Sequence, residues 1–319
     1  MTETTKEIFE KHQVRINKKQ KKNFRNYLET VCTANGYEYK EEKGMFGAKN
    51  VVIGDVENAK IIYTAHYDTQ PILPFPYIVM PKKPILTILL QCIFILGLLA
   101  IGILSANLIC LVLKLCGVPI FILKIIFYIL VGLVWLYLLL SPYLGVANKH
   151  TANDNTSGVT TLIDIMTSLP KTNRHNVAFV FFDLEELGLL GSYGFANKHK
   201  NIQKNSLIVN FDCVSNGKKI LFVVLKKAKK YKDVLEKSFV SSKDLEVEFA
   251  SKWVYYPSDQ SSFKCGVGVA ALNKKGKIEY LNKIHSSKDT IYQEENITFL
   301  VKGAKKLINE LNKTENQPE

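Results

Sequence analysis

The sequence predicts an α/β fold, in which a mostly parallel mixed sheet is covered by helices on both faces and interrupted by an inserted two-helix hairpin. Apolar segments of strand length alternate with helical segments, a pattern typical of parallel sheets that are buried on both faces. Two long apolar runs without charged residues interrupt this alternation. At 319 residues, the chain can bury a substantial core as one large domain or two small ones.

The first 65 residues are predicted to form one helix and three strands. The expected elements are a helix over residues 19–34 ended by Asn35 and Gly36, short strands near Tyr37 and Val51, and an apolar strand over residues 61–65. This last strand places His66 and Asp68 directly after its end.

Residues 85–144 are predicted to form a transmembrane helical hairpin, inserted into a domain made of residues 1–84 and 145–319. The runs at 84–113 and 125–148 contain no charged residue, and LKLCGVPIF between them supplies the glycine and proline of a reversal. A helix rises about 1.5 Å per residue, so about 20 such residues cross the hydrocarbon layer of a bilayer. Two buried helices of a soluble core are the less favoured alternative, because such helices keep a polar stripe.

The charges around the hairpin predict the side of the membrane on which the domain lies. Lys82 and Lys83 precede the first run and Lys149 follows the second, whereas the turn offers only Lys114 and Lys124, which can snorkel to the far headgroups. No signal peptide is expected in the polar N-terminal segment. The positive-inside rule therefore predicts an integral protein of the cell membrane whose domain lies in the cytoplasm.

The overall composition agrees with this location. The net charge is +13 and the pI about 9.3, while 47% of the residues are hydrophobic. A basic surface beside a bilayer favours anionic lipid, so the bilayer is an expected partner. Nucleic acid is not, because the chain shows no recognised binding module or aromatic-basic platform. Six cysteines without a CxxC pair or regular spacing fit a reducing compartment.

The part of the chain that follows the hairpin is predicted to continue the alternation of strands and helices. The expected elements are a polar loop HTANDNTSGV, a helix over 157–168, strands in NVAFVFFD, SLIVNFD, KILFVVL and GVGVAAL, a basic helix near 228–240 and an amphipathic helix over 297–311.

Acids and histidines gather where predicted strands end. His66 and Asp68 follow one strand, Asp183 with Glu185 and Glu186 follows another, and Asp212 ends a third, while Asp154 and His285 lie in loops. Ligands of open α/β sheets gather beyond the carboxyl ends of strands, and a histidine/carboxylate set without cysteine suits zinc. Each of these short motifs alone is weak evidence for a metal site, and an isolated Glu-Glu pair more often lies in a solvated loop. Together, in this order, they are specific.

With these segments in place, the chain resembles the dizinc exopeptidases of the aminopeptidase Y and bacterial leucyl aminopeptidase type. Glutaminyl-peptide cyclases and the transferrin receptor are related to that family. The resemblance rests on HYD at 66–68, NDNTSGV at 153–159, EELGLLGS at 185–192, NFD at 210–212 and IHSSKDT at 284–290. It covers the chain apart from the hairpin, and the separation of His66 from Asp154 becomes ordinary once the insertion is removed.

The resemblance implies a role for each of these residues. His66 and Asp212 would bind one Zn²⁺ and Glu186 and His285 a second, with Asp154 bridging both. Glu185 would be the general base and Asp68 would orient His66. The function it implies is a zinc-dependent aminopeptidase that hydrolyses N-terminal residues from peptides through a metal-activated water, and the predicted hairpin would anchor it in the membrane.

One segment departs from the family pattern. Family members often show Ser-Asp-His near the site, whereas this chain has SDQSSF at 258–263, with Gln260 in place of the histidine. Glutamine can hydrogen-bond but cannot carry a proton, so substrate preference is affected more than activity. Tyr255 or Tyr256 is a candidate for stabilising the oxyanion, and ordinary packing is the alternative for both.

Two other functions remain as alternatives. A glutaminyl-cyclase-like acyltransferase would use one zinc, and the complete five-ligand set favours hydrolysis over it. A non-catalytic receptor or scaffold usually loses ligands, and none is lost here. The hairpin lies between His66 and Asp154, so its ends must lie near the rim of the site. The mouth could thus face the membrane and favour hydrophobic or membrane-derived peptides; the alternative is a simple anchor.

Overall fold

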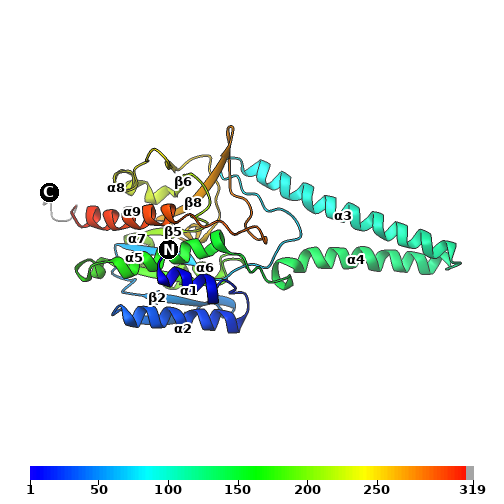
Figure 1. Cartoon of the computed structure of the whole chain (residues 1–319), viewed down its shortest axis with the longest axis horizontal. Coiled ribbons are helices and arrows are strands. Elements are labelled where there is room, and N and C mark those ends of the chain that lie inside the picture. The colour runs from blue at the N-terminus through cyan, green and yellow to red at the C-terminus, as the bar shows by residue number, and fades with distance from the viewer. Residues whose placement is uncertain (314–319) are drawn as a thin grey trace.

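A nine-stranded mixed sheet forms the centre of the fold in the computed structural model, which describes residues 1–313 (Figure 1). The strands are β1 Tyr39–Lys43, β2 Lys49–Ile53, β3 Ile61–His66, β4 Val177–Phe182, β5 Leu207–Phe211, β6 Lys219–Val224, β7 Glu246–Ala250, β8 Gly266–Lys275 and β9 Ile278–Tyr280. Their order is β1-β2-β4-β3-β5-β8-β6-β7, with β9 paired to β8. The four central strands β4-β3-β5-β8 are parallel to one another.

Helices cover both faces of this sheet. They are α1 Glu3–Lys11, α2 Lys18–Ala34, α5 Gly158–Ser168, α6 Leu190–Lys198, α7 Ile202–Asn205, α8 Lys232–Ser238 and α9 Glu294–Lys313. The larger core joins one face of the sheet to α1, α2, α5, α8 and α9, whereas a smaller core joins the opposite face to α6 and α7. The predicted fold class is therefore confirmed.

The register of the central strands determines where the polar residues meet. Every residue of β3, β4 and β5 is buried, which explains their nearly continuous apolar sequences. In the parallel β3–β4 pair, His66 lies opposite Phe182, so both strands end at the same level. Asp212 follows the last residue of β5 at the same edge of the sheet. The carboxyl ends of three strands thus deliver their polar residues to one place.

The hairpin extends away from the sheet as two long helices, α3 Pro84–Leu115 and α4 Ile120–Leu144 (Figure 1). Each is long and apolar enough to cross a membrane, and only 6% of its most apolar window is buried. A helix of a soluble core would be mostly buried instead. The two helices pack on each other away from the sheet, toward the turn that joins them, where a β-carbon added at Gly102 would lie 2.9 Å from Val134.

Ion pairs fasten the start of the hairpin to the sheet. The Lys82 ammonium lies 2.5 Å from Glu248 on β7 and 3.0 Å from Glu279 on β9. Lys219 on β6 is 5% exposed and pairs with the same two glutamates. Since these carboxylates are shared between a sheet lysine and a hairpin lysine, α3 leaves the domain from a fixed point.

Most elements expected from the sequence are present, with differences at the periphery. The expected basic helix at 228–240 is shorter, because α8 begins at Lys232 after tight turns over Lys226–Tyr231. Lysines at 226, 227, 229 and 230 would lie three or four residues apart on one helix, where like charges repel. Helices α1, α6 and α7 and the edge strands β7 and β9 were not predicted.

Candidate metal centre

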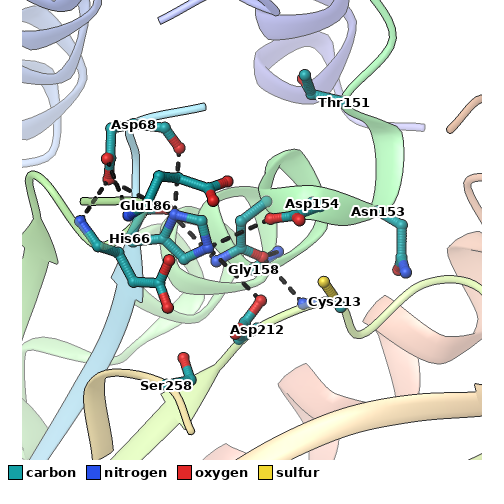
Figure 2. A network of polar contacts seen from close by, with 12 residues as sticks. His66, Asp68, Thr151, Asn153, Asp154, Gly158, Glu186, Asp212, Cys213 and Ser258 are labelled. Atoms are coloured by element: carbon teal, nitrogen blue, oxygen red, sulfur yellow. Dashed lines mark hydrogen bonds and ion pairs between the residues drawn. The ribbon is translucent and has the colours of Figure 1, made fainter. Parts of the chain in front are cut away.

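The polar residues predicted from the sequence converge at the carboxyl edge of the central strands. Figure 2 shows His66, Asp154, Glu186 and Asp212 together there. His66 is the last residue of β3, Asp212 follows β5, and Glu185 and Glu186 lie in the loop after β4. Asp154 comes from the tight turn Ala152–Ser157 that precedes α5, and His285 from the loop between β9 and α9.

Asp154 lies between two groups of side chains, with one carboxylate oxygen facing each. Its Oδ1 is 3.4 Å from His66 Nε2, which is also 3.5 Å from Asp212 Oδ1. Its Oδ2 is 2.7 Å from His285 Nε2, which is 3.4 Å from Glu186 Oε2. The five residues therefore form two pairs that share one aspartate.

The chemistry of these donors fits divalent cations. Potential ligand atoms of His66, Asp154 and Glu186 all lie within 4.8 Å of one another, and so do those of His66, Glu185 and Asp212. Imidazole nitrogens and carboxylate oxygens are suitable zinc ligands. Among residues 1–313, the buried Glu186 Oε1 and His285 Nδ1 have no hydrogen-bond partner. A buried carboxylate oxygen without a partner is unfavourable unless a cation lies beside it.

The site concentrates negative charge that the protein only partly offsets. Burial raises the pKa of Glu186 well above its usual value, and Asp154 nearby raises it further. Burial also opposes ionisation of Asp154, but His285 and His66 beside it outweigh burial and lower the pKa of Asp154. A bound cation stabilises the charged form of both carboxylates.

Arg15 is a buried cation beside the site that the sequence did not indicate. Its side chain is fully buried and donates to the carbonyl oxygens of Tyr67 and His12 and to the Thr156 hydroxyl. Burial lowers the pKa of Arg15 to about 10, and attraction to Asp68 and Asp154 opposes this decrease. Arg15 thus offsets part of the charge of these two carboxylates.

Asp68 holds the loop that carries the two adjacent glutamates. Its carboxylate accepts the backbone N–H of Glu185 at 3.1 Å and that of Glu186 at 3.3 Å. The same carboxylate lies 3.6 Å from His66 Nδ1, whose shorter contact is the Asp68 carbonyl oxygen at 3.1 Å. Asp68 is therefore placed to orient the glutamate loop as well as His66. Leu184, with φ 57°, turns the chain sharply before this pair.

Asp183, the other acid after β4, does not join the group. Its carboxylate accepts from the Lys21 ammonium at 2.7 Å and from the Lys49 backbone N–H at 3.0 Å. It therefore fastens α2 and β2 to the end of β4.

Asp289 supports Asp154 from the other side and was also not predicted. Its two carboxylate oxygens accept the backbone N–H groups of Asn153 and Asp154, both at 2.9 Å. Burial raises the pKa of Asp289 to about 7. Because Asp289 belongs to the segment IHSSKDT, that one segment supplies both His285 and the support of the Asp154 loop.

Gln260 is a buried packing residue in this structure. Its amide donates to the Tyr256 carbonyl at 2.6 Å and accepts from Asn210 at 3.1 Å, and its side chain lies against Gly268. The neighbouring Asp259 is fully buried. Burial raises the pKa of Asp259 to about 7.

The two tyrosines of this segment differ in environment. Tyr256 is buried and its hydroxyl donates to the Asp212 carbonyl at 3.2 Å, whereas Tyr255 is 59% exposed. A third tyrosine, Tyr77, stacks on the His285 ring with centroids 4.9 Å apart. Stacking fixes the plane of that imidazole.

A cavity of about 720 Å³ opens onto the centre. Its floor is lined by His66, Asp154, Glu185, Glu186, Asp212 and His285. Its walls are lined by Tyr77, Tyr255 and Tyr256, and the first turns of α3 complete it. A small molecule or the terminus of a peptide can therefore reach the histidine/carboxylate cluster from outside.

Several solved structures with the same fold come from bacteria. The LapA aminopeptidase of Legionella pneumophila matches with a TM-score of 0.59 and 15% identity, over 97% of this chain and 68% of that one. A Zn-dependent exopeptidase from Parabacteroides distasonis matches with a TM-score of 0.56 and 14% identity, over 97% of this chain and 94% of that one. A glutaminyl cyclase from Bacteroides thetaiotaomicron matches with a TM-score of 0.56 and 14% identity, over 96% of this chain and 94% of that one. At these identities the likeness shows the fold.

Sequence comparison identifies the family. No curated protein sequence matches the chain. Residues 141–304, just over half of the chain, match the profile of peptidase family M28. This match includes all predicted site residues except His66 and Asp68, which precede the hairpin. Together with the fold, it confirms the resemblance found in the sequence: the chain belongs to peptidase family M28.

Proposed function

We propose that the protein is a membrane-anchored, zinc-dependent aminopeptidase that removes N-terminal residues from peptides. The observation that carries this proposal is the position of Asp154 between two histidine/carboxylate pairs. His66 and Asp212 would hold one zinc ion, Glu186 and His285 the other, and Asp154 both. Zinc bound there would polarise a scissile carbonyl and lower the pKa of water.

Glu185 is the group we assign to proton transfer. Its carboxyl lines the cavity next to His66 and Asp212, and its backbone N–H is held by Asp68. Burial raises the pKa of Glu185 well above its usual value. In the proposed reaction Glu185 accepts the proton of the attacking water and then donates it to the leaving amine. Such transfer contributes about 10²- to 10⁴-fold to the rate of comparable enzymes.

The adjacent glutamates provide a matched pair of variants. Glu185→Gln should keep both zinc ions and lose about 10²- to 10⁴-fold in kcat on leucine amide, because only the proton acceptor is removed. Glu186→Gln, one residue further, should lose zinc because a ligand is removed. Metal content by mass spectrometry and hydrolysis rates measure both. Full turnover by Glu185→Gln would contradict the assignment.

Glutaminyl cyclisation is the competing activity, since cyclases share the fold. It would use one zinc ion, so metal stoichiometry separates the two functions. A peptide with N-terminal glutamine should be hydrolysed and not cyclised by the wild-type protein. One bound zinc together with a pyroglutamyl product would favour the cyclase.

We also propose that α3 and α4 cross the membrane, with residues 1–84 and 145–319 as one catalytic domain in the cytoplasm. The exposed apolar surface of both helices and the lysines at their domain ends support this arrangement.

A further inference from the structure

The substrate cavity continues from the candidate metal centre onto the hairpin. The residues of α3 that line it are Pro84, Thr87, Ile88, Gln91, Cys92 and Ile95. Their spacing of three or four residues places them on one face of the helix. On the same face further along, Leu99 and Ala106 are buried and Gly102 lies against Val134 of α4. One face of α3 thus lines the cavity in its first turns and packs against α4 further along the helix.

This change is possible because the two helices are separated near the domain and come together toward the turn (Figure 1). At the domain end, Pro142 of α4 also lines the cavity. The loop between β3 and α3 forms a further wall, to which alternate residues Leu73, Phe75, Tyr77 and Val79 contribute. Apart from the metal-binding floor, the cavity is therefore largely apolar.

The polar side chains of the α3 wall mainly attach the helix to this loop. The Thr87 hydroxyl accepts the Met80 backbone N–H at 2.8 Å, and the Gln91 amide donates to the Ile78 carbonyl at 3.3 Å. Gln91 Oε1 is buried and has no partner among residues 1–313. It remains available to accept a hydrogen bond from a peptide N–H group.

The outer side of the same turns faces away from the protein. Ile85, Leu89 and Ile93 are 74%, 52% and 61% exposed and do not line the cavity, whereas Ile88, which is 59% exposed, does line it. The 32 residues of α3 extend about 48 Å, more than the roughly 30 Å of a hydrocarbon layer. Its first turns therefore lie where the bilayer meets the domain, with lipid on one side and the cavity on the other.

An aromatic loop lies at the same level. The Tyr255 backbone N–H donates to the Pro81 carbonyl at 2.8 Å, just before α3 begins. Trp253, two residues earlier, is 91% exposed. Tryptophan and tyrosine prefer the membrane interface, so this loop places the cavity mouth at the membrane surface.

From these observations we infer the substrate class of the proposed aminopeptidase: peptides in which the residues after the scissile bond are apolar, bound along α3 and admitted from the bilayer side. The inference rests on the proposed function. The floor holds the N-terminal residue, whereas Ile88 and Ile95 contact the apolar residues that follow. A peptide already partitioned into the membrane presents that segment at the level of the mouth.

Matched variants in lipid nanodiscs test this inference with three substrates: leucine amide, Leu-Ala-Val-Leu-Phe-Val and Leu-Ala-Ser-Gln-Asn-Ser. The wild-type protein should prefer the apolar peptide to the polar one. Ile88→Asn and Ile95→Asn should each lower kcat/KM for the apolar peptide about tenfold relative to leucine amide, as loss of an apolar pocket contact does. The lipid-facing variants Ile85→Asn and Ile93→Asn should keep the wild-type ratio. Equal ratios in all four variants would overturn the inference.

Native cysteines give a second measurement, in which the α3 wall of the cavity carries no substitution. In the Glu185→Gln protein, the apolar peptide should slow modification of Cys92 by N-ethylmaleimide, whereas Cys116 at the far end of the hairpin should react unchanged. Equal protection of both cysteines, or of neither, would contradict the inference. If zinc-loaded wild-type protein hydrolyses no substrate, leucine amide included, the proposed function itself fails. If it hydrolyses leucine amide without preferring the apolar peptide, only the inference fails.

Discussion

Three side chains outside the proposed ligand set determine where the ligands of the metal centre point. Asp68 holds the backbone of Glu185 and Glu186, and Asp289 holds that of Asn153 and Asp154. Asn155 joins the turn before α5 to the end of β5, since its amide donates to the Phe211 carbonyl and accepts the backbone N–H of Cys213. Ligand loops at a sheet edge have few neighbours of their own, so these buried hydrogen bonds supply the rigidity that metal binding requires.

Replacement of Asp289 should weaken metal binding without unfolding the protein. In Asp289→Asn one oxygen can still accept an N–H group, while the other N–H loses its acceptor and the Asp154 loop loosens. We expect zinc affinity to fall about 10- to 100-fold, as for other residues that support ligands. Competition with a zinc chelator measures the change, with the exposed Asp233→Asn on α8 as control. Unchanged affinity would show that Asp154 needs no such support.

The sequence was sufficient to predict the proposed ligands and one of their supports, Asp68, but not Arg15 or Asp289. His66, Asp212 and the Glu185-Glu186 pair follow strands whose apolar sequences are unmistakable, and short motifs mark the others. Arg15 is different, because an arginine in a lysine-rich N-terminal segment resembles any surface cation. Its burial comes from contacts with Tyr67 and Thr156, which are distant in sequence. Asp289 likewise becomes recognisable only when its loop meets the Asp154 turn.

Among the elements, α5 depends most on one residue. Gly158 begins this helix directly under the metal centre, where a β-carbon would lie 2.2 Å from the Phe211 carbonyl oxygen. The helix can therefore approach β5 closely only with glycine at this position. That approach brings Asp154, just before α5, near Asp212, just after β5.

Gly158→Ala should therefore affect stability and metal binding together. Relief of the clash requires α5 to move from β5, and overpacking of this kind costs about 1–3 kcal/mol of unfolding free energy. Zinc affinity should fall as Asp154 moves with the helix. Gly97→Ala on α3, where an added β-carbon meets nothing within 4 Å, is the control. A variant with wild-type stability and zinc affinity would refute the requirement for close approach.

Regular elements with strong patterns were predictable, whereas weakly patterned ones were not. Helix α2 has a capping box between Asn17 and Gln20 and buries Phe24, Leu28 and Cys32 along one stripe. Helix α6 instead contains two glycines, and β7 is a half-exposed edge strand rich in glutamate. Helix α6 is positioned by packing on the sheet and β7 by pairing with β6. The local sequence does not encode these contacts.

At the scale of the whole molecule, the sheet with its covering helices and the hairpin share one cavity. The domain supplies the polar floor and the hairpin supplies an apolar wall, so the insertion is more than a tether in this arrangement. The Lys82 ion pairs with Glu248 and Glu279 fix the start of α3 relative to the sheet. In the proposed arrangement, the turn between α3 and α4 lies on the opposite side of the bilayer from the sheet.

Cys116 gives a direct test of that orientation, because it is exposed at the end of α3, next to the turn. If the domain is cytoplasmic, a membrane-impermeant maleimide added to intact cells should modify Cys116. Labelling should disappear in Cys116→Ser, which controls for the remaining cysteines. Labelling of Cys116 only after the membrane is broken would reverse the orientation.

The order of strands has a consequence for biosynthesis. Strand β3 leaves the ribosome before the hairpin, but both of its neighbours in the sheet, β4 and β5, are translated after it. The middle of the sheet therefore stays open until α3 and α4 have been made and β4 and β5 have followed. If the hairpin crosses the membrane as proposed, maturation is tied to its insertion, and a molecule that misses the membrane would not bring Asp154, Glu186 and Asp212 to His66 at the end of β3.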